Sequence, residues 1–217
     1  MRHILVCIIS VFIFNIVQAQ IRLSDKDFKS SLPVAEKYLI EIFDKGNFIK
    51  SVKADFDLSR EVVEVDHDKK YKSSGQTHFA KYSDLFFWVI QDKDTVGSFN
   101  VLVDSNARIV NRNLNIDLAD PNSPILIVGY KKLLASEFKL NFKQVLESGR
   151  KHKFKMAPIF QAYINNNNLI KENKVFVEVK YVWFFSEVDE SGGYNQLYLN
   201  AQTGKMEKED YIKRMPQ

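Results

Sequence analysis

A strand–turn–strand pattern occurs twice in this 217-residue chain and constrains the fold more than any other feature. In the first copy, the apolar residues 87–90 precede a polar turn and a second apolar run that ends at Asp104. In the second copy, residues 182–185 precede a Gly-Gly turn and a run that ends at Asn200. One offset of 95 residues separates three matched pairs: Trp88 and Trp183, Gly97 and Gly192, Phe99 and Tyr194. Because self-similarity at a fixed offset indicates repeated units, we expect a tandem repeat. The alternative is a chance match, since the chain has only two tryptophans.

The residues before the first copy favour a helix. Ser31 is a good N-cap residue, and Pro33 then falls in the first turn, where its missing N–H costs nothing. Apolar residues recur on one face up to Gly46, at which we expect the helix to end. These residues are Val34, Tyr38, Leu39, Ile42 and Phe43.

Two helices are expected before the second copy. Pro124 suits the first position of a helix, and residues 125–138 are apolar enough to be buried. Asn141 and Gln144 have the spacing of a capping box, in which each side chain bonds a backbone N–H of the other. This second helix should stop at Gly149.

The remaining segments favour strands. Odd positions from Val175 to Phe185 are apolar or aromatic, whereas Glu178 and Lys180 occupy even positions. This period of two predicts a strand with one packed face and one partly solvated face. Helices packed on antiparallel sheets define an α+β fold, here with two similar halves. Further strands are expected at 48–56, 60–65, 85–91 and 154–164, with turns at 189–193 and 200–206.

The first 19 residues predict a signal peptide. Arg2 precedes a 14-residue apolar run, Ile4–Val17, and small residues Val17 and Ala19 flank Gln18 before a cut at Gln20. A helix of that length spans about 21 Å, short of the ~30 Å hydrocarbon core. We therefore expect an exported protein, periplasmic or secreted, with no stable membrane insertion after signal cleavage. A membrane anchor or a buried N-terminal helix is the alternative.

Cysteine content and charge exclude several functions. The only cysteine, Cys7, would leave with the signal peptide, so the mature chain has no disulfide, thiol nucleophile or thiolate metal site. The net charge is +4, and the one dense basic run is 150–153. Such a run contacts phosphate in some proteins and is a solvated surface in most. Export argues against nucleic acid as a partner.

Residues 177–206 resemble PepSY domains, which end in an aromatic-alternating strand and the turn Asp-Ala-x-Thr-Gly-x followed by an apolar residue. The matching turn here is Asn200–Met206, with Asn200 in place of Asp. The first copy, Asp104–Ile109, lacks the Thr-Gly pair. The resemblance implies two PepSY-like repeats, at 20–115 and 124–217, that bind a protein or peptide without catalysing a reaction. The segment 111–124, which is rich in Asn, Asp and Pro, is the expected boundary.

The same hairpin is similar to small bacterial immunity domains of the nuclear-transport-factor-2-like fold. Those domains pair a helix with a Trp strand, a Gly-Gly turn and a final Asp-Gly-Lys-apolar turn. Trp183, Gly192-Gly193 and Gly204–Met206 fit this pattern. This second resemblance implies neutralisation of a secreted toxin.

Catalytic and metal-binding motifs are absent from the sequence. None of His67, His78 and His152 belongs to a ligand motif, and no P-loop, Gly-x-Ser-x-Gly or dinucleotide fingerprint occurs. His67 lies between two aspartates, an arrangement found in cation sites and more often in charged turns. We therefore expect no cofactor, no metal and no catalytic residue.

Three residues are weak candidates for ligand binding. Glu178 would serve as a carboxylate catalyst or, with Lys180 beside it, as part of a solvated strand face. Tyr181 would line a groove or pack in the core, and Tyr194 follows the Gly-Gly turn. Aromatic residues at period two on a sheet are more often core.

The sequence therefore predicts an exported, non-enzymatic binding or inhibitory module. Its partner would be an unknown protein or peptide, docked as an extended segment along an exposed sheet edge. A periplasmic immunity protein is one alternative, and a carboxylate-dependent hydrolase with a deep groove is another.

Overall fold

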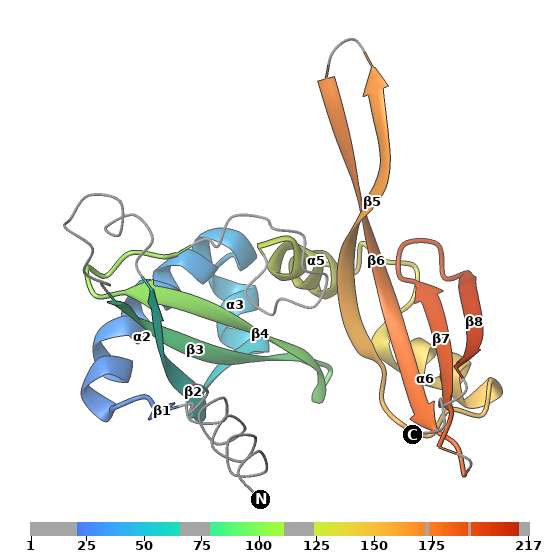
Figure 1. Cartoon of the computed structure of the whole chain (residues 1–217), viewed down its shortest axis with the longest axis horizontal. Helices are drawn as coiled ribbons and strands as arrows, with labels where there is room; N and C mark the ends of the chain where they lie inside the picture. The colour runs from blue at the N-terminus through green and yellow to red at the C-terminus, as the bar shows by residue number, and fades with distance from the viewer. Residues whose placement is uncertain (1–20, 66–78, 111–123, 172–173, 191, 213–217) are drawn as a thin grey trace, which may run out of the picture.

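A computed structural model of the chain describes residues 21–65, 79–110, 124–171, 174–190 and 192–212. It contains two four-stranded antiparallel sheets and four helices in the described residues, so the predicted α+β class is confirmed (Figure 1). Sheet A has the strand order β1-β2-β3-β4, and sheet B has the order β5-β6-β7-β8. The elements are β1 (Ile21–Arg22), α2 (Asp25–Phe43), α3 (Lys45–Ser51), β2 (Val52–Val65), β3 (Phe79–Gln91), β4 (Asp94–Asp104), α5 (Pro124–Leu134), α6 (Phe142–Lys151), β5 (Ile159–Lys171), β6 (Lys174–Val188), β7 (Tyr194–Asn200) and β8 (Met206–Ile212).

The first helix starts earlier than the sequence predicted. Its N-cap is Ser24, whose hydroxyl oxygen accepts a hydrogen bond from the Asp27 N–H at 3.1 Å. Ser31 is buried inside α2 instead of capping it, and its hydroxyl bonds that of Ser83 at 2.9 Å. Pro33 therefore lies in the helix interior, which costs about 3 kcal/mol. Burial of a stripe at four-residue spacing offsets that cost; the stripe is Ser31, Ala35, Leu39 and Phe43.

Helix α2 also ends before the predicted residue. Asp44 has φ of 60°, which breaks the helix, and its carboxylate then caps α3 through the N–H of Asn47 at 2.9 Å. Gly46 is thus inside α3. The predicted strand at 48–56 was wrong at its start, since Phe48 belongs to α3 and the strand begins at Val52.

The second helical region follows the prediction closely. Asn141 and Gln144 form the predicted capping box, with side-chain bonds of 2.9 and 3.0 Å to each other's backbone N–H. The helix passes Gly149 and ends at Lys151. The predicted turn at 189–193 joins β6 to β7, with Gly192 at φ 78°.

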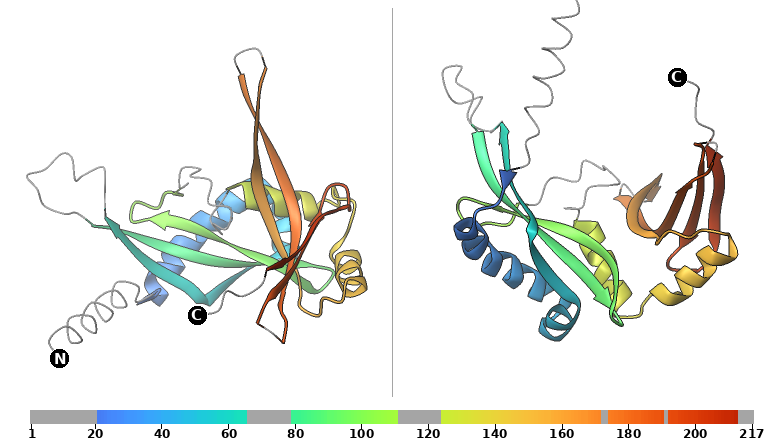
Figure 2. Two further views of the ribbon diagram at one scale, coloured as in Figure 1. Left: turned by 45° about the vertical axis from the view of Figure 1, so that its right-hand side comes forward. Right: turned by 90° about the horizontal axis from the view of Figure 1, so that it is seen from below.

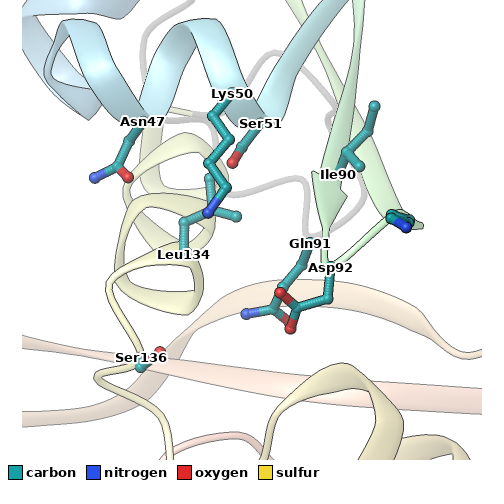
Figure 3. A pocket seen from close by; sticks show the side chains of 9 residues that line it. Asn47, Lys50, Ser51, Ile90, Gln91, Asp92, Leu134 and Ser136 are labelled. Carbon is teal, nitrogen blue, oxygen red and sulfur yellow. The ribbon is translucent and has the colours of Figure 1, made fainter.

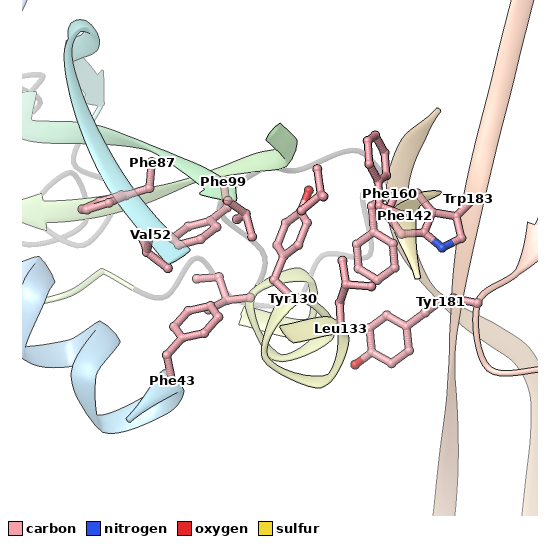
Figure 4. Close-up of a cluster of buried hydrophobic side chains, with 14 of the residues drawn as sticks. Phe43, Val52, Phe87, Phe99, Tyr130, Leu133, Phe142, Phe160, Tyr181 and Trp183 are labelled. Carbon is pink, nitrogen blue, oxygen red and sulfur yellow. The ribbon is translucent and has the colours of Figure 1, made fainter. Parts of the chain in front are cut away.

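The two sheets share one continuous hydrophobic core, and α5 joins them (Figure 4). The ring of Tyr130 on α5 lies 6.0 Å from that of Phe99 in sheet A and 5.0 Å from that of Phe160 in sheet B. The Phe160 ring in turn lies 4.8 Å from that of Trp183. Tyr130 is 2% exposed, and its burial raises its pKa, although a backbone hydrogen bond with Ser98 acts the other way.

The equivalence of residues 95 apart is wrong at all three pairs. Trp183 is fully buried on the covered face of sheet B, whereas Trp88 lies on the opposite face from the buried Phe87 and donates to Asp55 at 2.9 Å. Side chains alternate along a strand, and the packed residues have odd numbers in both β3 and β6, as Phe87 and Trp183 do, so an odd offset matches opposite faces of the two sheets. The other pairs also differ. Gly97 is in strand β4 and Gly192 in a turn, and Phe99 is buried whereas Tyr194 is 43% exposed.

The order of elements is nevertheless alike in the two halves. Each half places helices before an antiparallel meander, with β2-β3-β4 in one and β5-β6-β7 in the other. Whether these halves are a duplication stays a prediction. The signal peptide and most of the 111–124 boundary lie outside the described residues. Among the described helices, none is long and apolar enough to cross a membrane.

Candidate functional site

Sheet B has one face packed against helices and one face open to solvent. On the packed face, Phe142 of α6 lies 5.6 Å from the Trp183 ring, and α5 contacts β5 (Figure 2). Tyr181 lies on this face, 3% exposed, and its hydroxyl donates to the Ile125 carbonyl at 3.4 Å. Burial raises the pKa of Tyr181. Of the two interpretations of Tyr181, a groove-lining residue or a core residue, the structure therefore supports the core residue.

The other face of sheet B carries two rows of apolar side chains. In one row, Val188 pairs with Tyr194, which pairs with Ile212; these residues are 63%, 43% and 48% exposed. In the next apolar row, Phe184 pairs with both Ile159 and Tyr198, and the rings of Phe184 and Tyr198 are 4.8 Å apart. We call this surface the open face of sheet B: Ile159, Phe184, Val188, Tyr194, Tyr198 and Ile212.

Strand β8 forms the outer edge beside the open face. It pairs with β7 on one side, and no described strand pairs with its other side (Figure 2). Its ends carry exposed apolar side chains: Met206 is 51% exposed and Tyr211 53%. Between them lie Glu207, Lys208, Glu209 and Asp210, which give the strand a net charge of −2. An unpaired edge presents a row of backbone N–H and C=O groups that a further strand can pair with.

Polar contacts fix the start of β8. Asn200 is 7% exposed, its amide donates to Glu207 at 2.7 Å, and its carbonyl oxygen accepts from the Thr203 N–H at 2.9 Å. Lys180 approaches the Glu207 carboxylate at 3.7 Å. At the other end of the strand, Lys208 forms an ion pair with Asp210. These contacts hold the edge in place before any partner arrives.

The candidate Glu178 lies in the long β5–β6 hairpin, which extends beyond β7 and β8 (Figure 1). It pairs with Asn165 across the hairpin, and its side chain lies outside the described residues. Of the two candidates whose side chains are described, Tyr194 is exposed and Tyr181 is buried.

A small cleft of about 230 Å³ near the end of β8 contains two carboxylates, Glu187 and Asp210. Glu187 accepts hydrogen bonds from the backbone N–H groups of Lys155 and Met156, and Asp210 pairs with Lys208. Both carboxylates are therefore occupied by structural contacts. Across the described part of the chain, no group of three or more His, Cys, Asp and Glu side chains is arranged to hold a metal.

The chain matches no protein-family model, no curated protein and no solved structure. The resemblances to PepSY and immunity domains therefore stay predictions. The apolar residues of the open face other than Tyr194 were not singled out in the sequence. These residues share a face only because of the register between the strands. The positions of single apolar residues in the sequence do not specify that register.

Proposed function

We propose that this protein is an exported, non-enzymatic binding module that takes an extended segment of a partner protein alongside β8. The open face of sheet B carries the proposal, because four of its apolar side chains are between 43% and 63% exposed next to an unpaired edge. Exposed apolar side chains that gather on one face of a sheet favour an interaction surface, here in two rows separated by Ser186, Gln196 and Asp210. In β-strand addition, the backbone supplies affinity and side chains on alternate positions supply specificity.

The charge of β8 favours a basic segment. Three acidic residues and one lysine lie between Met206 and Tyr211. Charges on an edge strand also disfavour pairing with uncharged or acidic strands, which limits aggregation. A partner strand with basic residues would complement the net charge of β8, and its apolar residues would pack against Ile212 on the open face.

This arrangement supports binding over catalysis. A hydrolase of the kind considered above needs two available carboxylates in a groove, whereas Glu187 and Asp210 are both engaged. A toxin bound by an immunity protein would be one partner of the proposed kind. Its docking would use the same edge.

The test uses two acetylated peptides long enough to span β8, one of alternating valine and lysine and one of alternating valine and glutamate. Hydrogen exchange of the β8 amides is measured with each peptide. We expect the lysine peptide to slow exchange in β8 and the glutamate peptide to leave it unchanged. Equal effects of the two peptides, or no effect of either, would refute the proposal.

A matched pair of variants locates the surface. Ile212→Ser removes an open-face side chain that is 48% exposed, whereas Ile21→Ser removes one that is 54% exposed on sheet A. Burial of an isoleucine contributes about 1.5–3 kcal/mol, so Ile212→Ser should weaken lysine-peptide binding about tenfold or more. Ile21→Ser should leave binding unchanged, and an equal loss in both variants would exclude the open face.

A further inference from the structure

A cleft of about 630 Å³ lies where the two halves meet, at the ends of α3 and α5 and the β3–β4 turn (Figure 3). Its volume is in the range of small-molecule sites, about 300–1,000 Å³. Its walls combine Ile90 and Leu134 with polar side chains from both halves. It contains none of the residues of the open face, so its role is independent of peptide binding at β8.

Ser51, a largely buried residue, supplies a hydroxyl to this cleft. The residue is only 6% exposed, and its hydroxyl makes no hydrogen bond within the described part of the chain. Figure 3 shows the Ser51 oxygen directed from α3 into the cleft. The hydroxyl is not one of the fully buried, unpaired side-chain atoms of the described residues, so solvent reaches it from the cleft. The cleft therefore offers a donor that a bound polar group would satisfy.

Two lysines give the cleft a positive charge. Lys50 projects from α3 into the cleft beside Ser51, and Lys93 lies on the β3–β4 turn. Neither makes an ion pair or a side-chain hydrogen bond among the described residues. With Asp92 as the single acidic group in the lining, the net charge of the lining is +1.

The carbonyl groups at the end of α5 accept hydrogen bonds from groups other than these lysines. The α5 carbonyls of Lys131, Lys132 and Leu133 accept backbone N–H groups from the residues that follow the helix. The Gln91 amide also donates to the Leu133 carbonyl at 3.2 Å. Since the Lys50 side chain makes no contact of this kind among the described residues, it is available to pair with an anion.

We propose that this cleft binds a small carboxylate that carries an aliphatic body. The carboxylate would accept from the Lys50 ammonium and the Ser51 hydroxyl, with Lys93 adding to the positive potential. The aliphatic body would pack on Ile90 and Leu134. Ammonium and hydroxyl donors around a carboxylate form charge-assisted hydrogen bonds, which are stronger than neutral ones.

Two probes of equal shape test the requirement for an anion. N-acetyl-leucine carries a carboxylate, and N-acetyl-leucinamide replaces it with a neutral amide. Each is titrated into the 15N-labelled protein, and shifts of the Ser51 and Gln91 backbone amides are followed at millimolar concentrations. We expect saturable shifts with N-acetyl-leucine and none with N-acetyl-leucinamide. Equal binding of both probes, or binding of neither, would overturn the proposal.

Variants on α3 test the placement. Lys50→Met should weaken N-acetyl-leucine binding about tenfold, the effect of losing one charge-assisted hydrogen bond. Ser51→Ala should weaken it several-fold without altering the packing, since it removes only the hydroxyl. Lys45→Met, on the same helix and outside the cleft lining, is the control. Unchanged affinity in both Lys50→Met and Ser51→Ala would overturn the proposal even if N-acetyl-leucine binds.

Discussion

Replacement of Tyr130 with alanine should destabilise both halves of the molecule together. The ring is 2% exposed and lies between Phe99 of sheet A and Phe160 of sheet B, at 6.0 and 5.0 Å. Removing it would leave a cavity in the segment of core that joins the two sheets. The loss of packing contacts at this position should destabilise both sheets, because the buried residues form one cluster.

The magnitude follows from two contributions. Truncation of a buried aromatic ring to alanine costs about 3–5 kcal/mol. The hydrogen bond between the Tyr130 hydroxyl and the Ser98 backbone adds about 1 kcal/mol. Tyr130→Ala should therefore cost about 4–6 kcal/mol, a large part of a typical stability of about 5–15 kcal/mol. Tyr130→Phe keeps the ring and should cost only about 1 kcal/mol.

The assay uses the two tryptophans, because each reports one sheet. Trp88→Phe leaves the sheet B fluorophore, and Trp183→Phe leaves the sheet A fluorophore. Trp183→Phe costs no hydrogen bond among the described residues, although it removes part of a fully buried ring and should itself lower stability. Urea unfolding followed by fluorescence gives one midpoint for each background, and each is compared with the same background carrying Tyr130→Ala. Tyr130→Ala should lower both midpoints by the same amount.

Two results would contradict this reasoning. One is a loss below about 1 kcal/mol for Tyr130→Ala, which would mean that the ring does not pack as described. The other is a shift confined to one fluorophore, which would mean that the sheets unfold independently.

Three further predictions concern single contacts. Gly149→Ala should lower stability by about 1–3 kcal/mol in thermal melts, because its Cβ would overlap the ring of Phe185; an unchanged melting temperature would contradict this. Trp88→Phe should raise the pKa of Asp55, which the indole hydrogen bond holds below 3.8, and NMR titration of the carboxyl carbon measures it. Because the folded-state pKa is lowered, this contact stabilises the protein above about pH 4 and is lost as the pH falls further. Gln91→Leu should cost about 1–3 kcal/mol in urea unfolding, since it leaves the Phe142 N–H unpaired and removes one of the two hydrogen bonds to the Leu133 carbonyl. A neutral effect would show that water replaces the side chain.

The sequence specified those elements whose signals are local. The capping box at Asn141 and Gln144 and the glycine turn after Asp189 both depend on residues a few positions apart, and both occur as predicted. Helix α2 was placed too late because Pro33 is unfavourable inside a helix. Its burial against sheet A, a tertiary effect, outweighs that local preference.

Contacts between strands were not predictable in the same way. An offset of 98 residues, not 95, relates the paired residues of the two hairpins: Phe87 and Phe99 correspond to Phe185 and Leu197. The matched tryptophans pointed to a different register, and a shift by an odd number exchanges the two faces. The open face was missed for the same reason, apart from Tyr194. Its residues lie on four strands, β5 to β8, and come together only through register.

Two adjacent residues of α5, Gly129 and Tyr130, determine how closely α5 packs against each of the two sheets. A Cβ at Gly129 would lie 2.5 Å from the Tyr181 ring and 2.9 Å from that of Phe160, so glycine at this position permits close approach to sheet B. Tyr130, the next residue, reaches Phe99 in sheet A. Moving α5 away from either sheet would therefore empty part of the shared core. This packing holds the uncovered face of sheet B and strand β8 in one geometry, and a preformed edge costs a partner less ordering entropy than a mobile one.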